Sequence, residues 1–295
     1  MTWLWSTITG TTAVMGQAKL GFVAAAFAVD TLALFVMAFR WRLLLRSLRS
    51  SANYVETLLA YSAGVCVCNI TPARALGGDA CRAALIPRPD GSPPMTAIGA
   101  SVVYDRASDV AGFFMLCGLA LPRLRPQSPH WGLLALVAIA AALVARPLYR
   151  RLISRIGRRH HALIGNEMGT SMAAALGCSL VIWTLDITRI MLVAHAFGVR
   201  LVPSQAATVS LLRLGSGLVP VPAGIGVVDG ALVAGFVWLG LPASTAAAMA
   251  IVERAIVYGW STALGATALT LLGGSRALKK ARTTTAASFK PDMPS

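Results

Sequence analysis

Residues 20–39 read LGFVAAAFAVDTLALFVMAF, an apolar run whose only charge is Asp30. A helix of about 20 apolar residues is long enough to cross the hydrocarbon core of a bilayer. Further apolar runs of this kind follow along the whole chain, at residues 55–70, 95–121, 131–145, 170–197, 204–219 and 244–272. The sequence therefore predicts an all-α, polytopic integral membrane protein with about six to eight membrane segments.

The composition supports the same class. Of the 295 residues, 56% are hydrophobic and 13% are charged, whereas soluble domains carry about 25% charged residues. This balance excludes an ordinary soluble enzyme, a coiled coil and a disordered chain. We expect a single transmembrane domain over residues 20–273, preceded by an N-terminal segment, 1–19, of uncertain topology.

The net charge of +15 is distributed as membrane topology requires. Basic residues gather at 40–49, 146–159 and 276–290, between or after the apolar runs. We expect the protein to lie in the cell (plasma or inner) membrane. The positive-inside rule then places all three blocks on the cytoplasmic side. We therefore expect no nucleic-acid partner, and we expect residues 274–295 to form a basic, disordered cytoplasmic tail.

Two Pro- and Gly-rich stretches resemble each other and predict broken, re-entrant hairpins. In both, a proline precedes an aspartate by seven residues, and an acid–Arg pair follows 24 or 26 residues later. The first copy holds Pro72, Gly77, Gly78, Asp79 and Asp105–Arg106; the second holds Pro222, Gly224, Gly226, Asp229 and Glu253–Arg254. Three expected spans separate the hairpins, so the copies, at about 20–121 and 170–273, form a predicted inverted-topology repeat.

Charged side chains inside the expected spans need an explanation, because each costs about 3 kcal/mol at the bilayer centre. They must face inward, pair with one another, or line a wet cavity. Spacing of three residues favours the pairs Arg106–Asp109 and Asp186–Arg189. Glu253 and Arg254 are adjacent and cannot face each other, so each requires a partner elsewhere.

These charges predict a central polar site, near the membrane midplane, for an anionic headgroup. The planar guanidinium of arginine binds phosphate well, and the acids would orient the arginines, pair with a cationic headgroup or carry a coupling proton. Gly-rich breaks would bring half-helix N-termini close to the ligand. We expect Arg213 to face Asp229, Glu253 or an anionic ligand. The expected substrate-binding residues are Asp79, Arg82, Asp105, Arg106, Asp109, Arg213, Asp229, Glu253 and Arg254.

Other charged and thiol groups have simpler interpretations. Asp30 and the pair Asp186–Arg189 are interpreted as structural ion pairs that tie helices together. Five cysteines at irregular spacing predict neither a disulfide framework nor a metal site. No P-loop, zinc-protease or nucleophile motif occurs, so the sequence predicts no catalytic residue and no cofactor.

Several stretches resemble the membrane domain of the lysylphosphatidylglycerol synthetase family over about residues 20–272. They are LGGDACR at 76–82, YDRASD at 104–109, PVPAGIGVVDG at 220–230, Glu253–Arg254 and Arg40-Trp41-Arg42. The resemblance implies a lipid-handling role, since in the two-part synthetases this domain resembles a flippase for aminoacylated phosphatidylglycerol. The sequence stops shortly after its last expected span, so we expect no synthetase domain. Residues 1–18 lack the clear extra span that is usual in the family.

The first functional hypothesis is a non-enzymatic, flippase-like lipid translocase. It would move an anionic or aminoacylated phospholipid, or another lipid-linked phosphate, between the leaflets. Its expected partners are membrane lipids, and a separate lipid-modifying enzyme is a further candidate partner. One alternative is an intramembrane enzyme on a lipid-linked substrate, which would change lipid chemistry and not only the leaflet. The other is an accessory subunit of a membrane complex, which would co-purify with one partner.

Overall fold

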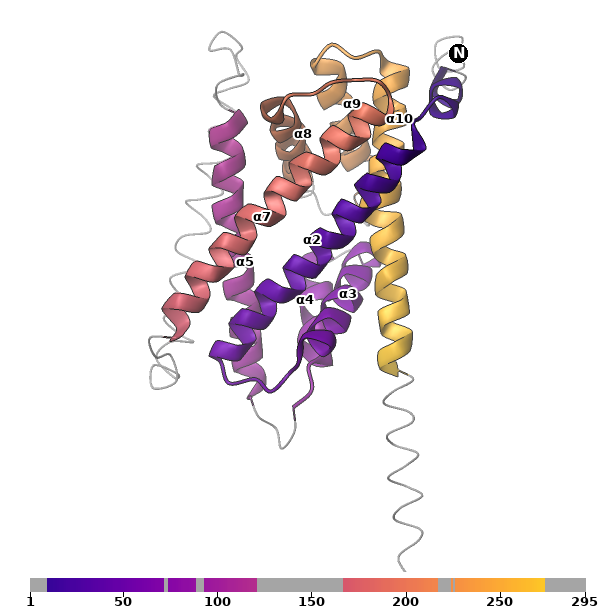
Figure 1. The fold of residues 1–295 in the computed structure, drawn as a ribbon. Coiled ribbons are helices and arrows are strands. Elements are labelled where there is room, and N and C mark those ends of the chain that lie inside the picture. The colour runs from indigo at the N-terminus through magenta and orange to yellow at the C-terminus, as the bar shows by residue number, and fades with distance from the viewer. Residues whose placement is uncertain are drawn as a thin grey trace, which may run out of the picture.

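The computed structural model describes residues 10–71, 74–88, 93–120, 167–216, 224 and 226–273, and within these ranges every regular element is a helix (Figure 1). The predicted all-α class is confirmed. Residues 10–16 form one short helix of the N-terminal segment. The expected span at 131–145, the tail at 274–295 and the hairpin prolines Pro72 and Pro222 lie outside the described residues.

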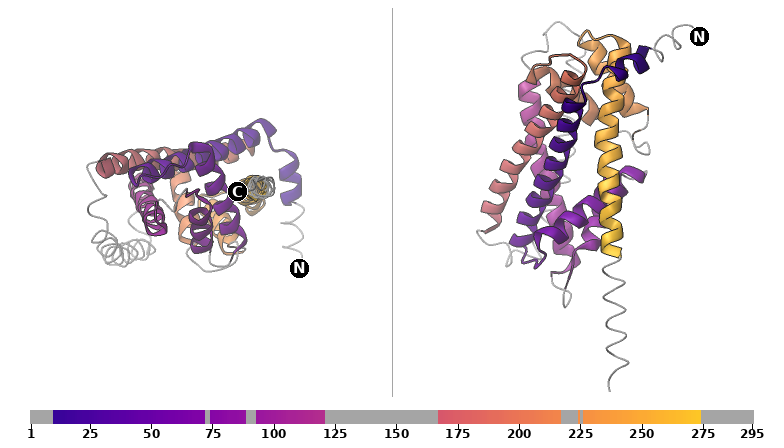
Figure 2. Two further views of the ribbon diagram at one scale, coloured as in Figure 1. Left: turned by 90° about the horizontal axis from the view of Figure 1, so that it is seen from below. Right: turned by 45° about the vertical axis from the view of Figure 1, so that its right-hand side comes forward.

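Two long antiparallel helices, α2 (Leu20–Ser47) and α7 (Glu167–Ala196), lie side by side along the molecule (Figures 1 and 2). The backbone N–H of Lys19, which precedes α2, donates to the carbonyl of Ala196 at 2.9 Å, so the start of one helix meets the end of the other. This pair occupies the junction between the two halves of the chain.

The sequence analysis ended the first apolar span at Phe39, but the helix that contains this span extends further. Helix α2 continues to Ser47, and Arg40 and Trp41 inside it are fully buried. The prediction treated Arg40 as part of a solvated basic block, as the positive-inside rule suggests. Asp105 and Asp109 of the neighbouring helix Met95–Ala120 instead hold this guanidinium inside the bundle.

Two further long helices complete the frame. Helix α5 (Met95–Ala120) packs against α7, and α10 (Ala243–Arg254) continues through the π-helical segment η4 (Ala255–Trp260) to Gly273. Among the residues that the structure describes, three helices are long and apolar enough to cross a membrane, namely Leu20–Ser47, Thr170–Ala196 and Ala243–Gly273. Helix α5 has sufficient length but carries the charged residues Asp105, Arg106 and Asp109.

Two short helical hairpins lie toward opposite ends of the molecule (Figures 1 and 2). One consists of α3 (Tyr54–Ile70) and α4 (Arg74–Leu85), the other of α8 (Pro203–Ser216) and α9 (Val227–Trp238). Helices α4 and α9 have 12 residues each, about 18 Å at 1.5 Å per residue. Neither can cross a hydrocarbon core of about 30 Å alone, as expected for broken hairpins.

Each half of the chain has its own apolar core. One cluster forms around Trp41 and Leu45 and joins α2 to α3, α4 and α5; the other forms around Ile190 and Phe236 and joins α7 to α8, α9 and α10. Leu116 of α5 packs into the second cluster, which links the two halves.

Local signals fix where the hairpin helices begin. Asn53 and Glu56 form a capping box on α3, each side chain bonding the other residue's backbone N–H at 2.9 Å. Helix α9 begins after Gly226, whose φ of 81° suits glycine. The Gly226 N–H donates to the Asp229 carboxylate at 3.0 Å, so Asp229 closes the first turn. Gly224 also has a positive φ, of 65°.

Gly77 and Gly78 do not break a helix, contrary to the prediction, because both lie inside α4. Their small size instead allows α4 to approach α3. A Cβ atom on Gly78 would lie 2.5 Å from the carbonyl oxygen of Gly64 and 2.8 Å from the Cβ of Cys68. Only glycine fits this helix crossing.

The close crossing of α3 and α4 predicts that a single methyl group added at Gly78 destabilises the fold. Gly78→Ala must push α4 away from α3, and we expect a loss of about 1–3 kcal/mol in the free energy of unfolding, typical of overpacking. Gly177→Ala on α7, where a Cβ meets nothing within 4 Å, is the matched control and should be neutral or slightly stabilising. Thermal unfolding in detergent measures both variants, and equal midpoints would contradict the close crossing.

Candidate functional site

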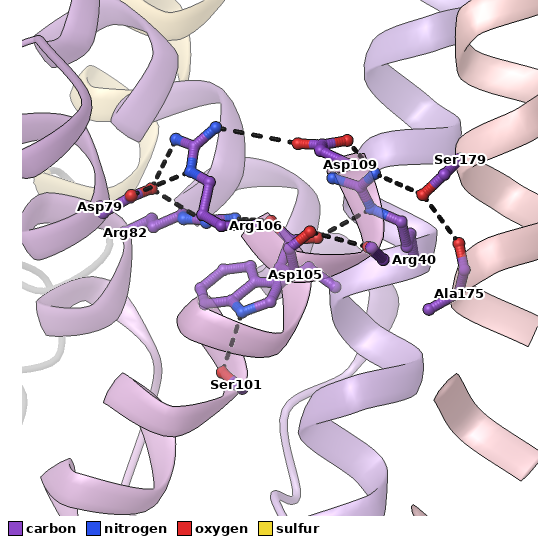
Figure 3. Close-up of polar contacts among 11 residues, drawn as sticks. Arg40, Asp79, Arg82, Ser101, Asp105, Arg106, Asp109, Ala175 and Ser179 are labelled. Carbon is purple, nitrogen blue, oxygen red and sulfur yellow. Dashed lines mark hydrogen bonds and ion pairs between the residues drawn. The ribbon is translucent and has the colours of Figure 1, made fainter. Parts of the chain in front are cut away.

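Six charged residues from α2, α4 and α5 form the first network. It contains three arginines and three aspartates, so its formal charges balance: Arg40, Arg82, Arg106, Asp79, Asp105 and Asp109. Figure 3 shows these side chains converging between the helices, with Ser179 of α7 at one edge. Three helices of the first half and one of the second thus meet through one set of polar contacts.

Asp105 is the centre of the first network and is fully buried. It accepts from Arg40 Nε at 2.8 Å and from Arg82 Nη1 at 2.7 Å, so one carboxylate joins α2, α4 and α5. The guanidinium of Arg40 also donates to Asp109 and, at 2.9 Å, to the Ser179 hydroxyl. These bonds satisfy a fully buried arginine, which would otherwise be prohibitively costly inside the protein.

Arg82 is held by aromatic rings as well as by carboxylates. Its guanidinium carbon lies 4.8 Å from the ring centroids of both Trp41 and Tyr61, within the range of cation–π attraction. The Trp41 indole N–H donates to Ser101 at 3.0 Å, which fixes that ring (Figure 3). Arg82 is therefore rigidly positioned.

The opposite edge of the first network is open. Arg106 binds Asp79 with two parallel hydrogen bonds, of 3.0 Å from Nε and 2.8 Å from Nη2. The Arg106 side chain is 46% exposed and that of Asp79 is 17% exposed. The expected Arg106–Asp109 pair is present, although its 4.0 Å separation is long. This edge is the part of the network that a ligand can reach.

Five charged residues form the second network, centred on Arg189 of α7: Asp30, Asp186, Arg189, Arg213 and Glu253. The buried Arg189 guanidinium donates to Glu253 from Nε at 2.9 Å and from Nη2 at 3.2 Å. It also donates to Asp30 at 3.1 Å and to Asp186 at 2.8 Å. One arginine thus joins α2, α7 and α10.

The sequence analysis expected Arg213 to face Asp229, Glu253 or an anionic ligand. In the structure it faces neither of these two acids. Its Nη2 donates to Asp186 at 2.5 Å, and the Ser210 hydroxyl of the same helix donates to that carboxylate at 2.6 Å. The sequence analysis considered only acids near the second hairpin as protein partners, whereas α8 packs on α7. Its third candidate, an anionic ligand, stays a prediction. Asp186 therefore anchors α8 to the second network.

A separate pair in the second half matches the open edge of the first. Arg254 of α10 lies 3.4 Å from Asp229 of α9, and its guanidinium stacks over Tyr258 at 3.8 Å. The side chains of Arg254 and Asp229 are 20% and 36% exposed. As expected, adjacent Glu253 and Arg254 find different partners, Arg189 and Asp229 respectively.

The contacts recur between the halves at a nearly constant offset. Arg40 and Arg189 are 149 residues apart, and the pair Asp79–Arg106 recurs as Asp229–Arg254. Arg40 of α2 donates to Ser179 of α7, and Arg189 of α7 donates to Asp30 of α2. Asp30 and Ser179 are also 149 residues apart. A two-fold rotation that exchanges α2 and α7 requires such reciprocal contacts.

The nine expected binding residues therefore do not form one central cluster. Five of them belong with Arg40 to the first network, Arg213 and Glu253 belong to the second, and Asp229 and Arg254 form the separate pair. Among the ion pairs that the described ranges contain, none joins the first network to the second. In the same ranges, no group of three His, Cys, Asp or Glu side chains is placed to hold a metal.

The sequence analysis did not recognise Arg40 as part of the site, although it quoted the motif around it. The available signal was the repeat offset, which aligns Arg40 with Arg189 inside an apolar run. Asp30, Asp186 and Arg189 do tie helices together, as interpreted, and they also surround one of the expected binding residues, Glu253.

Comparison with known proteins identifies the family. The family described as "Lysylphosphatidylglycerol synthase TM region" matches residues 3–265. The chain belongs to this family. The match includes both networks and both hairpins, so these features lie within the part of the chain that the family covers.

Relatives of the full transmembrane region occur in archaea. A UPF0104 membrane protein of Methanothermobacter thermautotrophicus is 24% identical over 292 residues, covering 86% of each chain. One from Methanocaldococcus jannaschii is 24% identical, covering 85% of this chain and 84% of the relative, and one from Pyrococcus horikoshii is 20% identical, covering 88% and 90%. No solved structure matches this chain. These relatives support a multi-pass membrane protein.

Burial predicts different roles for Arg189 and Arg106. Arg189→Met leaves three carboxylates around one lost cation, and breaking a buried ion pair costs about 3–5 kcal/mol. Arg106→Met removes a half-exposed pair, which is worth about 1 kcal/mol or less. Unfolding midpoints in detergent should therefore fall strongly for Arg189→Met and little for Arg106→Met. A similar loss in both variants would show that the open edge is also structural.

Proposed function

We propose that this protein is a lipid translocase that moves an anionic or aminoacylated phospholipid, or another lipid-linked phosphate, between leaflets. The observation that carries the proposal is the partly exposed Arg–Asp pair in each half, Asp79–Arg106 and Asp229–Arg254. Membership of a family whose description concerns a phospholipid synthase supports lipid as the substrate.

The buried and open parts of the networks suit different tasks. Arg40, Asp105, Arg189 and Glu253 are almost completely enclosed and connect several helices, so they form a fixed scaffold. Arg106 and Arg254 are the accessible cations at the edges of this scaffold. A phosphate oxygen can replace one carboxylate oxygen on such an arginine, because both match the guanidinium fork.

Unsatisfied donors support an anionic ligand. Buried Nε–H groups of Arg82 and Arg213 have no hydrogen-bond acceptor among the described residues. An unsatisfied buried donor costs about 1–3 kcal/mol, and a phosphate headgroup brings several acceptors. One such donor lies in the first network and one in the second, so each half offers both an accessible arginine and an unmet donor.

The arrangement of the hairpins supports alternating access. The α3–α4 and α8–α9 hairpins lie toward opposite ends of the molecule, and α2 and α7 run antiparallel between them (Figure 1). An inverted repeat of this kind presents equivalent sites to opposite sides of a membrane. In the proposed cycle, the headgroup exchanges between the two open pairs while the lipid itself stays chemically unchanged.

Leaflet exchange in reconstituted vesicles tests the proposal. Labelled phosphatidylglycerol should exchange faster with the protein than without it, and Arg106→Gln or Arg254→Gln should reduce that rate at least about tenfold, a loss of about 1.4 kcal/mol in barrier stabilisation. Arg200→Gln is the charge-matched control, since Arg200 is exposed in the turn between α7 and α8. It should exchange lipid like the wild type.

Two results would overturn the proposal. If Arg106→Gln and Arg254→Gln both keep the wild-type rate, the open pairs do not carry the headgroup. If the label changes chemically during incubation, as mass spectrometry of the extracted lipids would reveal, the protein is an intramembrane enzyme and not a translocase.

A further inference from the structure

The second network contains more negative than positive charge. Its three carboxylates, Asp30, Asp186 and Glu253, face two guanidiniums, whereas the first network has three of each. All three acids are at least nine-tenths buried. A net charge enclosed in this way is expensive unless a bound ion or a proton neutralises it.

Comparison of the two halves locates the surplus at Asp30. The contact of Arg40 with Ser179 corresponds to the contact of Arg189 with Asp30. One network thus has a neutral hydroxyl where the other has a carboxyl. The remaining partners of the two arginines are carboxylates in both networks, so Asp30 is the position at which the symmetry of charge is broken.

The immediate surroundings of Asp30 can hold a proton. Its Oδ1 accepts from Arg189 at 3.1 Å, and its Oδ2 lies 3.0 Å from the Ser261 hydroxyl. When Asp30 is ionised, the hydroxyl donates to it. When Asp30 is protonated, the carboxyl O–H can donate to the hydroxyl oxygen, because serine is both donor and acceptor. Both states fit the same geometry.

The charged groups that face Asp30 come from every helix packed around it. Arg189 and Asp186 lie on α7, Glu253 lies on α10, and Arg213 reaches the network from α8 through Asp186. The end of the π-helix η4 and the residue after it also contact α2, because the Trp260 indole N–H donates to Thr31 at 2.9 Å and the Ser261 hydroxyl bonds Asp30. Asp30 therefore lies where α2, α7 and the last helix meet.

We propose that Asp30 is a reversible proton-binding site that controls how firmly α2 is held to α7 and the last helix. Ionised Asp30 adds a charged bond to Arg189, whereas protonated Asp30 keeps only a neutral one, and charge-assisted hydrogen bonds are about twice as strong. Proton binding loosens the junction between the halves. This inference rests on the proposed function, for which movement at this junction is required.

Leaflet exchange at equal pH on both sides of the vesicle tests the site. Between about pH 5 and about pH 8, a range in which proteins are generally most stable, wild-type exchange should accelerate as pH falls, by up to about tenfold per pH unit for one ionising group. Asp30→Asn is permanently neutral and should keep the fast rate at every pH. Asp30→Ser, which copies Ser179, should behave in the same way and serves if Asp30→Asn fails to fold.

A second measurement does not depend on transport. Infrared difference spectra of the purified protein should show the carbonyl stretch of a protonated carboxyl appearing at low pH, and Asp30→Asn should lack that band. Glu56→Gln is the control, because the Glu56 carboxylate caps α3 by accepting from the Asn53 backbone N–H and belongs to neither network. It should retain both the band and the pH profile.

The outcomes separate the two proposals. A band that disappears in Asp30→Asn, with no lipid exchange by any form, supports the proton site and overturns the translocase. Exchange whose pH dependence and carboxyl band persist unchanged in Asp30→Asn overturns the proton site. Lipid exchange that depends on sodium concentration and not on pH also overturns the proton site. In that case a metal cation, and not a proton, neutralises the surplus negative charge of the second network.

Discussion

The central constraint on this structure is the cost of enclosing a guanidinium in a helix bundle. Arg40 and Arg189 each sit within a membrane-length helix and are at most 5% exposed. Each can be there only if carboxylates from neighbouring helices surround it, because an unpaired buried charge is intolerable. Helix positions follow from this requirement, since α5 must approach α2 and α10 must approach α7 closely enough for these bonds to form.

Such pairs give specificity at little net gain in stability. Apolar residues could fill the same space without the desolvation penalty. The networks nevertheless favour one particular set of neighbours, because any other packing leaves a charge without a partner. Glycine contributes in a different way: Gly64 and Gly78 allow α3 and α4 to touch, and this holds the hairpin where Arg82 and Asp79 reach α5.

Hydropathy alone could predict most helices, because the apolar runs match α2, α3, α5, α7 and the last helix closely. It could not predict the end of α2, since an arginine after an apolar run normally marks the membrane surface. The partners of Arg40 and Arg213 could not be predicted because they depend on which helices become neighbours. The pairs of Glu253 and Arg254 could be anticipated as separate, because adjacent helical residues point in different directions. The inverted repeat stays a prediction, whereas the charges that were expected to form one central site divide into two networks and a separate pair.

The π-helical segment η4 sets the rotational phase of the last helix. A π turn accommodates an extra residue compared with an α turn, and each α-helical residue advances the side chains by about 100°. Everything between Ser261 and Gly273 is therefore turned relative to the acidic and basic pair at Glu253 and Arg254. The last helix can thus present Glu253 and Arg254 to α7 and α9. At the end of η4 it presents the Trp260 indole and the Ser261 hydroxyl to α2. A relative that differs by a single inserted or deleted residue here would keep its composition and hydropathy but lose this phase.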